Sequence, residues 1–480
     1  MSKESSSLLM REPGFFERYY ICRSTGDHYN KGFNMSVCLN KRVDDVLLSN
    51  ALRSMLLKYP TLCMNLFRLK PSSGPKNLLH DDRKANGTNY EARLVSKIQF
   101  TDVVCHQQLE RIDDDYFKTL SDRKILIDTD KPTWYILVNE VAESSNQYLT
   151  FATNHMFLDG NSGVNFLDDL VRELATAKSQ SNLKFVNVLF DSEVEGPKIL
   201  PESSDKVTDL FSFSTWFAIK TIVKELFLPT VIKKLFSSFF TRGDPNLFKN
   251  PIFNHHPVSL SNESNFHLLT LSPEETSASL KFCKSEGVTL TPFIAGCAFK
   301  ALDETLVPVL NIKPSYEFAI PICGRRYYPE IKEKTRYGLY MSQSKILVSR
   351  NNSVLSATKF ISHELVAALK SRESFSLAGL LRLINIWDHI QNSYDKKEVR
   401  SSAELSNVGL IKINHGEWRV EDCIFSQGVS STHFSISTCS TPYGGLNIMI
   451  ANHYSLDEIR HGLAMKRFMV AFKEKLVARK

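Results

Sequence analysis

A strand, a sharp turn and a helix follow one another over residues 147–174, and this unit is the sequence feature that most constrains the fold. The run QYLTFAT alternates like a half-buried strand and ends just before the turn that carries His155. After an Asp-Gly pair, Phe166, Leu170 and Leu174 recur at helical spacing. The preceding run PTWYILVNEV has the pattern of a neighbouring strand. Strands and helices that alternate in this way predict an α/β fold.

A chain of 480 residues is too long for one ordinary hydrophobic core, so we expect two halves. A second region begins near Pro257 and contains the helix TLTPFIAGCAFKAL and the strands EFAIPI, HFSISTC and GLNIMIANHY. We therefore predict a first half over residues 1–206, an apolar and basic connection over 207–256, and a second half over 257–480. Residues 70–92 are rich in turn formers and predict a long surface loop.

The charge and cysteine patterns narrow the class of protein. The 59 basic and 52 acidic residues are spread along the chain, whereas a nucleic-acid-binding protein gathers its positive charge in a stripe or tail. The nine cysteines occur singly, as the reduced thiols of cytoplasmic proteins do. The first residues have no apolar stretch long enough for a signal peptide, and no run of about 18 uncharged apolar residues occurs, so we expect neither a signal peptide nor a membrane-spanning helix. We expect a cytoplasmic protein that binds no nucleic acid.

His155 is the residue on which the functional interpretation depends. Zinc needs three or four ligands at defined spacing, and no His or Cys cluster stands near His155, so we expect no metal. The G-x-S-x-G motif of α/β hydrolases is absent, and GNSG lacks the Lys-Ser/Thr of a phosphate-binding loop. Two readings remain: a buried structural histidine, or a neutral imidazole that accepts a proton from a hydroxyl or an amine.

A family resemblance favours the second reading. His155-x-x-x-Asp159-Gly160 resembles the signature of the CoA-dependent acyltransferase superfamily. The stretches FERYYICRS, TLTPFIAGCAF, IPICGRR, RYGLYMS and ELSNVGLIKIN resemble, in the same order, those of the fungal alcohol acetyltransferase family. The D-F-G-W-G motif of plant members is absent, so no residue is carried over from it. The resemblance implies two halves like chloramphenicol acetyltransferase, with a central channel that CoA and the acceptor enter from different sides.

The resemblance also implies roles for residues around the histidine. His155 would act as the general base, while Asp159 would point away from the acceptor and pair with Arg325. The alternative for Arg325 is a solvated surface side chain. Gly160 would permit a backbone geometry that a side chain would obstruct.

Two polar residues of ELSNVGLIKIN are candidates for stabilising the oxyanion of the tetrahedral intermediate. Ser406 offers a hydroxyl donor and Asn407 an amide donor near the end of a predicted strand. The alternative is that both residues cap the end of that strand.

The implied activity is transfer of acetyl from acetyl-CoA to the primary hydroxyl of a hydrophobic alcohol, which gives an acetate ester. One alternative is N-acetylation of an amphiphilic amine such as a sphingoid-like base. Another is a degenerate fold that serves as a lipid-bound interaction module, which the intact His155, Asp159, Gly160 and Arg325 oppose.

Two segments combine apolar and basic residues. The first begins at Leu210, is interrupted by Pro229 and carries Lys220, Lys224, Lys233 and Lys234. The second is the C-terminal helix, with Ile459, Leu463, Phe468, Phe472 and Leu476 on one face. Each is typical either of a helix at a membrane surface or of a helix packed on the core. We expect peripheral association with the endoplasmic reticulum or lipid droplets.

Overall fold

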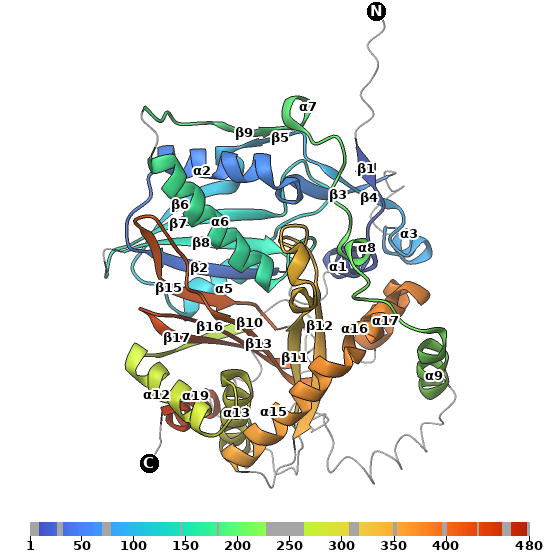
Figure 1. Cartoon of the computed structure of the whole chain (residues 1–480), viewed down its shortest axis with the longest axis vertical. Helices are drawn as coiled ribbons and strands as arrows, with labels where there is room; N and C mark the ends of the chain where they lie inside the picture. The colour runs from blue at the N-terminus through green and yellow to red at the C-terminus, as the bar shows by residue number, and fades with distance from the viewer. Residues whose placement is uncertain are drawn as a thin grey trace, which may run out of the picture.

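The computed structural model describes residues 9–25, 32–69, 78–144, 146–179, 182–226, 264–306, 316–348, 353–395, 401–429, 432–453 and 462–477. Two six-stranded mixed sheets dominate these residues, one in the upper half of the molecule and one in the lower half (Figure 1). The α/β fold with two halves that the sequence predicts is therefore confirmed.

The first sheet combines four strands of the N-terminal half with β14 and β15, in the order β14-β15-β2-β8-β7-β6. Adjacent strands of this sheet are antiparallel, except that β6 and β7 are parallel. Helices α2 and α6 pack against each other and contribute to the same core. The bounds are β2 Gly32–Leu39, β6 Val104–Leu109, β7 Trp134–Val141, β8 Gln147–Asn154, β14 Asn414–His415, β15 Trp418–Ser426, α2 Asp45–Lys58 and α6 Gly160–Lys178.

The second sheet has the order β10-β17-β16-β13-β11-β12, and its strand β13 runs parallel to both of its neighbours. Apolar side chains of these strands share a second core with residues of α13, α15 and α19. The bounds are β10 Ser264–Leu271, β11 Tyr316–Cys323, β12 Met341–Val348, β13 Ser401–Leu410, β16 Thr432–Thr441, β17 Gly445–His453, α12 Pro273–Ser285, α13 Leu290–Thr305, α15 Val354–Ser371 and α19 Leu463–Val477.

Smaller elements surround these layers. A three-stranded sheet has the order β1-β4-β3, and β5 pairs with β9. The bounds of the strands are β1 Met10–Arg11, β3 Met64–Arg68, β4 Tyr90–Leu94, β5 Lys97–Gln99 and β9 Val188–Asp191. Those of the helices are α1 Phe15–Thr25, α3 Leu78–Ala85, α4 Phe100–Val103, α5 Asp114–Asp122, α7 Ser192–Glu195, α8 Ser204–Val207, α9 Thr215–Leu226, α16 Glu373–Gly379, α17 Ile386–Asp395, η1 Pro60–Cys63, η2 Gly324–Tyr327, η3 Pro329–Ile331 and η4 Leu380–Leu383.

A strand of the second half joins the sheet of the first half. β15 lies late in the sequence, yet it pairs antiparallel with β2 of the first sheet, and Ile424 stands opposite Ser36. Residues 414–426, which the sequence division assigns to the second half, therefore complete the first sheet. The division at 207–256 stays a prediction, and most of that connection, residues 227–256, lies outside the described residues.

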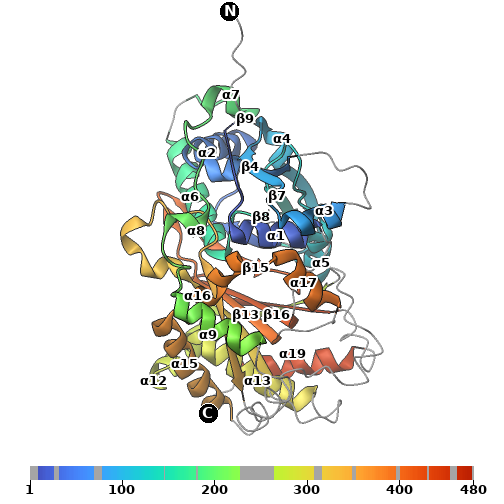
Figure 2. The same ribbon diagram turned by 90° about the vertical axis from the view of Figure 1, so that its right-hand side faces the viewer.

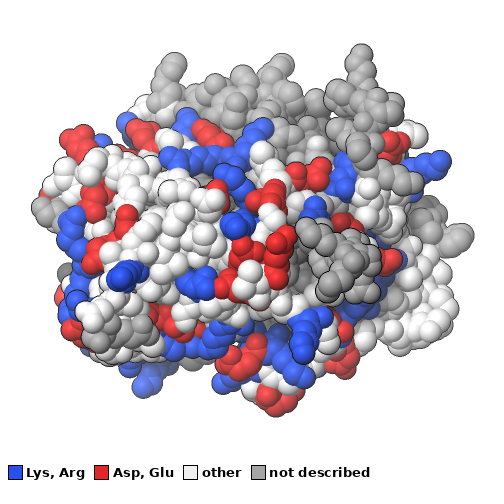
Figure 3. Space-filling model, turned by 90° about the horizontal axis from the view of Figure 1, so that it is seen from above, with Lys and Arg blue, Asp and Glu red and all other residues white. Residues whose placement is uncertain are grey.

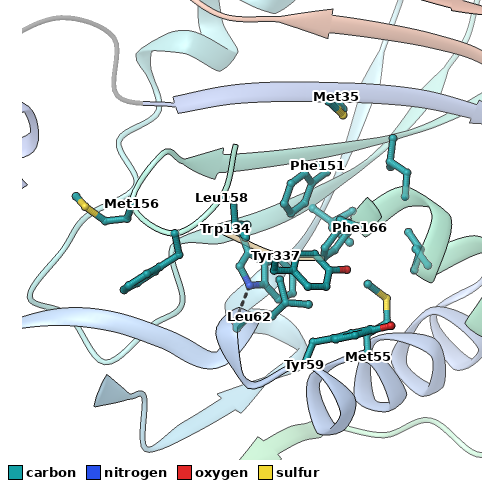
Figure 4. Close-up of a cluster of buried hydrophobic side chains, with 14 of the residues drawn as sticks. Met35, Met55, Tyr59, Leu62, Trp134, Phe151, Met156, Leu158, Phe166 and Tyr337 are labelled. Carbon is teal, nitrogen blue, oxygen red and sulfur yellow. Dashed lines mark hydrogen bonds between the residues drawn. The ribbon is translucent and has the colours of Figure 1, made fainter. Parts of the chain in front are cut away.

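An aromatic core fixes the strand–turn–helix unit that the sequence predicts (Figure 4). Phe151 of β8 stacks on Phe166 of α6 with 3.9 Å between ring centroids, so the helix is held against the strand that precedes it. Trp134 packs on the same pair and donates its indole N–H to the carbonyl oxygen of Leu62 over 2.7 Å. Satisfying this polar atom lets a large side chain lie fully inside the core.

The C-terminal helix α19 packs on the second core. Phe468, Phe472 and Leu476 are fully buried, and Phe468 stacks on Phe472 with 5.6 Å between ring centroids. The alternative that this helix packs on the core is therefore confirmed for Phe468, Phe472 and Leu476, whereas Leu463 at the start of the helix is 51% exposed. Ile459, part of the predicted apolar face, lies outside the described residues.

The predicted loop over residues 70–92 is also wrong in part. Helix α3 begins at Leu78, and β4 begins at Tyr90. Tyr90, Ala92 and Leu94 point into the core because β4 pairs with β1 and β3. Three alternating residues directly after a run of turn formers give too short a signal to be recognised, and long-range pairing decides the structure. Residues 70–77 lie outside the described residues.

All nine cysteines lie in described residues and are free thiols, as the sequence predicts. Among the helices that the structure describes, none has the length and hydropathy to cross a membrane.

Candidate active site

His155 stands in the turn between β8 and α6, at the junction of the two halves. Figure 2 shows helix α1 at this junction, above α17 and β15. The imidazole stacks on Tyr20 of α1 with 5.0 Å between ring centroids and 9° between planes. The ring of Phe33 meets it edge-on at 5.0 Å. Two rigid aromatic neighbours thus fix the orientation of the histidine.

The surroundings keep this histidine neutral. Burial lowers the pKa of His155 to about 4, and the positive charge of Arg23 acts in the same direction. The carboxylate of Asp159 and the backbone of Leu158 oppose this shift. Nδ1 is buried and has no hydrogen bond of ordinary geometry within the described residues, and the residue lines the cavity. At neutral pH the imidazole can therefore accept a proton.

Asp159 lines the cavity together with His155, and the structure pairs it with Arg325. Nη1 of Arg325 lies 2.7 Å from Oδ2 of Asp159, and both side chains are buried. The same carboxylate caps α6 by accepting the amide of Ser162 at 2.8 Å, and it accepts the amide of Tyr340 at 3.0 Å. Burial alone would raise the pKa of Asp159, but the charge and hydrogen bonds of these partners outweigh it and lower the pKa.

Ser162 hydrogen-bonds to both members of this ion pair, a contact that was not predicted from the sequence. Its Oγ accepts from Nη2 of Arg325 at 2.9 Å and from the amide of Gly338 at 3.2 Å. The same hydroxyl lies 2.9 Å from Oδ1 of Asp159, to which it can donate. The signal was its position three residues after a helix-capping aspartate, where capping partners occur.

A second buried carboxylate connects the middle of α6 to neighbouring segments. Asp169 is fully buried and accepts from Nε of Arg336 at 2.7 Å and from the hydroxyl of Tyr337 at 2.7 Å. Tyr59 of the segment that follows α2 donates to it at 3.1 Å. The RYGLYMS stretch thus contacts α6 both at its first turn and in its middle, which holds the histidine turn rigidly against the second half.

The two oxyanion candidates differ in their surroundings. Asn407 donates from Nδ2 to the hydroxyl of Thr291 at 2.9 Å, and its Oδ1 accepts the amide of Gly409 at 2.8 Å. The oxygen and one N–H of this amide are therefore engaged, while Nδ2 carries a second N–H and Asn407 also lines the cavity. Ser406 lies on the opposite face of β13, on the side of the strand that carries Glu404, and lines the cavity with it.

Gly160 is needed for space and not for an unusual backbone conformation. A Cβ atom at this position would lie 3.2 Å from Cγ1 of Val408, so the glycine lets β13 approach the start of α6. The left-handed conformation occurs instead at Gly409, where φ is +87° and the pairing of β13 with β16 shifts register. The prediction that Gly160 permits a backbone geometry that a side chain would obstruct therefore applies to the packing against Val408 and not to φ.

A cavity of about 860 Å³ joins these residues and reaches His155. This volume is in the range of small-molecule and cofactor sites. Tyr20 and Arg23 of α1, which the sequence quoted only as part of FERYYICRS, form its wall beside His155. Met341 and Lys345 of β12 line another part of it. Three or more side chains able to hold a metal ion do not gather anywhere in the described ranges.

Comparison with known proteins agrees with this geometry. Among solved structures, the trichothecene 15-O-acetyltransferase of Fusarium sporotrichioides aligns with 98% of this chain and 96% of its own at a TM-score of 0.62 and 12% identity. The first condensation domain of a calcium-dependent antibiotic synthetase aligns with 99% and 98% at a TM-score of 0.61 and 12% identity. At these identities the likeness shows the fold.

Proteins related in sequence identify the family. Alcohol O-acetyltransferase 2 of Saccharomyces cerevisiae is 24% identical over 91% of this chain and 90% of its own. Alcohol O-acetyltransferase 1 of the same yeast is 25% identical over 67% of this chain and 64% of its own. The profile of the alcohol acetyltransferase family matches residues 12–476. The chain is thus an acyltransferase and belongs to the alcohol acetyltransferase family.

Proposed function

We propose that the protein transfers acetyl from acetyl-CoA to the primary hydroxyl of a hydrophobic alcohol and releases an acetate ester. This proposal rests on His155. Its imidazole is neutral, stacks on an aromatic ring and lies at a cavity between the two halves. The cavity is large enough to bring an acyl donor and an acceptor to one imidazole.

In the proposed reaction, Nε2 of His155 accepts the hydroxyl proton while the alcohol oxygen attacks the thioester carbonyl carbon. The tetrahedral intermediate collapses as the carbon–sulfur bond breaks, and the imidazolium returns the proton to the departing CoA sulfur. Ser406 stabilises the oxyanion in this scheme from the wall of the cavity, which Asn407 also lines, because Nδ2 of Asn407 already donates to Thr291. Asp159 and Arg325 position the histidine turn and do not touch substrate.

The test is to incubate purified protein with acetyl-CoA, a series of linear primary alcohols and decylamine, and to identify products by mass spectrometry. We expect acetate esters, with kcat/KM rising by up to about fourfold for each methylene that the cavity buries. Formation of only the amide of decylamine would replace the alcohol with an amine as acceptor. Absence of every acetylated product would overturn the proposed function.

We also propose that the protein associates with a membrane or lipid-droplet surface through α9. Trp216 is 73% exposed, and Ile219, Ile222 and Val223 are exposed on the same helix beside Lys220. Exposed aromatic and aliphatic residues next to a lysine are what an interfacial helix requires. Lys233, Lys234 and Pro229, which the sequence analysis included, lie outside the described residues.

Flotation with anionic liposomes tests this surface. We expect the wild type to float at low salt and less at high salt, and the double variant Trp216→Glu, Ile219→Glu to stay in the dense fraction, because it loses apolar insertion and adds negative charge. Val194→Glu is the matched control, since Val194 is an equally exposed apolar residue outside α9. Equal flotation of the double variant and the wild type would refute a role for α9.

The upper face of the molecule shows Lys and Arg side chains interspersed with Asp and Glu, without one continuous basic field (Figure 3). This mixture supports the proposal that the protein is not a nucleic-acid-binding protein.

A further inference from the structure

Part of the cavity that reaches His155 is lined by the consecutive helices α15 and α16, which both pack against β12 (Figure 1). Most of the side chains that these helices contribute are small or apolar. We call them the helical wall, and they are Ala367, Ala368, Ser371, Ser374, Leu377 and Ala378. Small side chains leave open a volume that longer ones would fill. The helical wall therefore has the composition of a site for a hydrocarbon chain.

The helical wall begins a short distance from the histidine turn. The amide of Tyr340 donates to Asp159 over 3.0 Å. Two residues later, on β12, Oγ of Ser342 donates to the carbonyl oxygen of Ser374 over 2.7 Å. Two residues of extended chain span about 7 Å, so a short alkyl chain can join a hydroxyl at His155 to the helical wall.

Other contacts hold the backbone of α16 in place. Oγ of Ser376 donates to the carbonyl oxygen of Ser212 over 2.9 Å, and the ring of Phe375 is fully buried. A Cβ atom at Gly379 would lie 2.1 Å from the carbonyl oxygen of Phe211, so the helix packs directly against that segment. The side chains of the helical wall thus project from a fixed backbone, and their size determines how much of the cavity stays open.

The charges of this region fit an acceptor chain better than CoA. The charged residues that α15 and α16 contribute to the lining are both acidic, Glu364 and Glu373, while Lys345 of β12 forms an ion pair with Glu317 at 3.4 Å. Carboxylates repel the phosphate groups of CoA but leave a hydrocarbon chain unaffected. The amides of the CoA arm also need hydrogen-bond partners, which alanine and leucine side chains do not provide.

We propose that the helical wall binds the hydrocarbon chain of the acceptor and that Ala367 and Ala378 set the chain length that fits. Leu377 lines the cavity and is also 45% exposed, so the cavity opens at α16 and the chain enters there. The inference rests on the proposed function and deepens it, because it assigns the residues that select among alcohols.

The test measures kcat/KM for butan-1-ol, hexan-1-ol, octan-1-ol and decan-1-ol in the wild type, Ala367→Leu and Ala378→Leu. Leucine fills space that the alanine leaves open, so the longer alcohols bury fewer methylenes. We expect the ratio of kcat/KM for decan-1-ol over butan-1-ol to fall at least about tenfold in each variant, because each methylene that is no longer buried costs up to about fourfold. KM for acetyl-CoA should not rise.

Ala278→Leu is the matched control and should keep the wild-type ratio, because Ala278 is an exposed alanine of α12 outside the cavity lining. Thermal melting shows which variants fold. Ala367 is exposed, so its variant decides the outcome alone if the half-buried Ala378 does not tolerate leucine.

A fall of this size in a folded variant upholds the inference. A wild-type ratio in every folded variant overturns it, and so does a higher KM for acetyl-CoA with an unchanged alcohol ratio, which would assign the helical wall to the acyl donor. In both cases ester formation by the wild type still upholds the proposed function. If the wild type acetylates no alcohol, the proposed function fails and the inference fails with it.

Discussion

Replacement of His155 by alanine is expected to lower kcat by about 10²–10⁴-fold, the usual contribution of a positioned general base. The side chain lies against Tyr20 and Phe33 at the cavity, so its removal leaves the sheets and the aromatic core intact. Initial rates of ester formation, with far-UV circular dichroism to confirm folding, measure the effect. A variant that keeps more than about a tenth of the wild-type kcat would rule out this role.

The pH dependence of kcat/KM reports the protonation of His155. Because burial and Arg23 lower the pKa of His155 to about 4, the competent neutral form predominates above that pH. The wild-type kcat/KM should therefore stay level as pH falls from 7 through 6.5, the ordinary pKa of histidine, and decline only near pH 4. His363→Ala, at an exposed histidine of α15, is the control and should keep both rate and profile.

Asp159→Asn is expected to reduce the stability of the protein as well as its activity. The change leaves Arg325 buried without its counter-charge, and loss of one partner of a buried ion pair costs about 3–5 kcal/mol of unfolding free energy. Since the pKa of Asp159 is lowered in the folded state, the wild-type pair contributes above pH 4 and is lost as pH falls through the folded pKa. Urea unfolding at pH 7 measures the difference.

Asp122→Asn is the matched control, because Asp122 is exposed at the end of α5 and its change should leave the unfolding free energy within about 0.5 kcal/mol of the wild type. If Asp159→Asn unfolds like the wild type but acts slowly, then the carboxylate takes part in the chemistry and its positioning role is wrong.

Local patterns predicted the elements that carry the site. The alternation before His155 and the helical spacing of Phe166, Leu170 and Leu174 were sufficient for β8 and α6, because both elements bury one regular face in a single core. Arg325 was paired with Asp159 by resemblance, and the structure shows the contact at 2.7 Å. The catalytic roles of His155, Ser406 and Asn407 remain predictions.

Contacts between distant segments could not be predicted from local patterns. Asp169 had the appearance of an ordinary helix carboxylate, and its burial against Arg336 and Tyr337 depends on how the second half docks. The C-terminal helix was ambiguous for the same reason, since an amphipathic face does not reveal whether protein or lipid covers it. The engagement of Asn407 by Thr291 depends on the packing of α13 on β13.

The pairing of β15, a strand late in the sequence, with β2 has a consequence for biosynthesis. The ribosome synthesises residues 32–154 long before residues 418–426. The edge of β2 that pairs with β15 is therefore unpaired while most of the chain is made. Exposed strand edges of this kind recruit other chains, and closing a loop of such length delays the final pairing. We therefore expect the nascent chain to expose this edge of β2 until β15 has been made, and a fragment that stops before β15 lacks the strand that covers the edge.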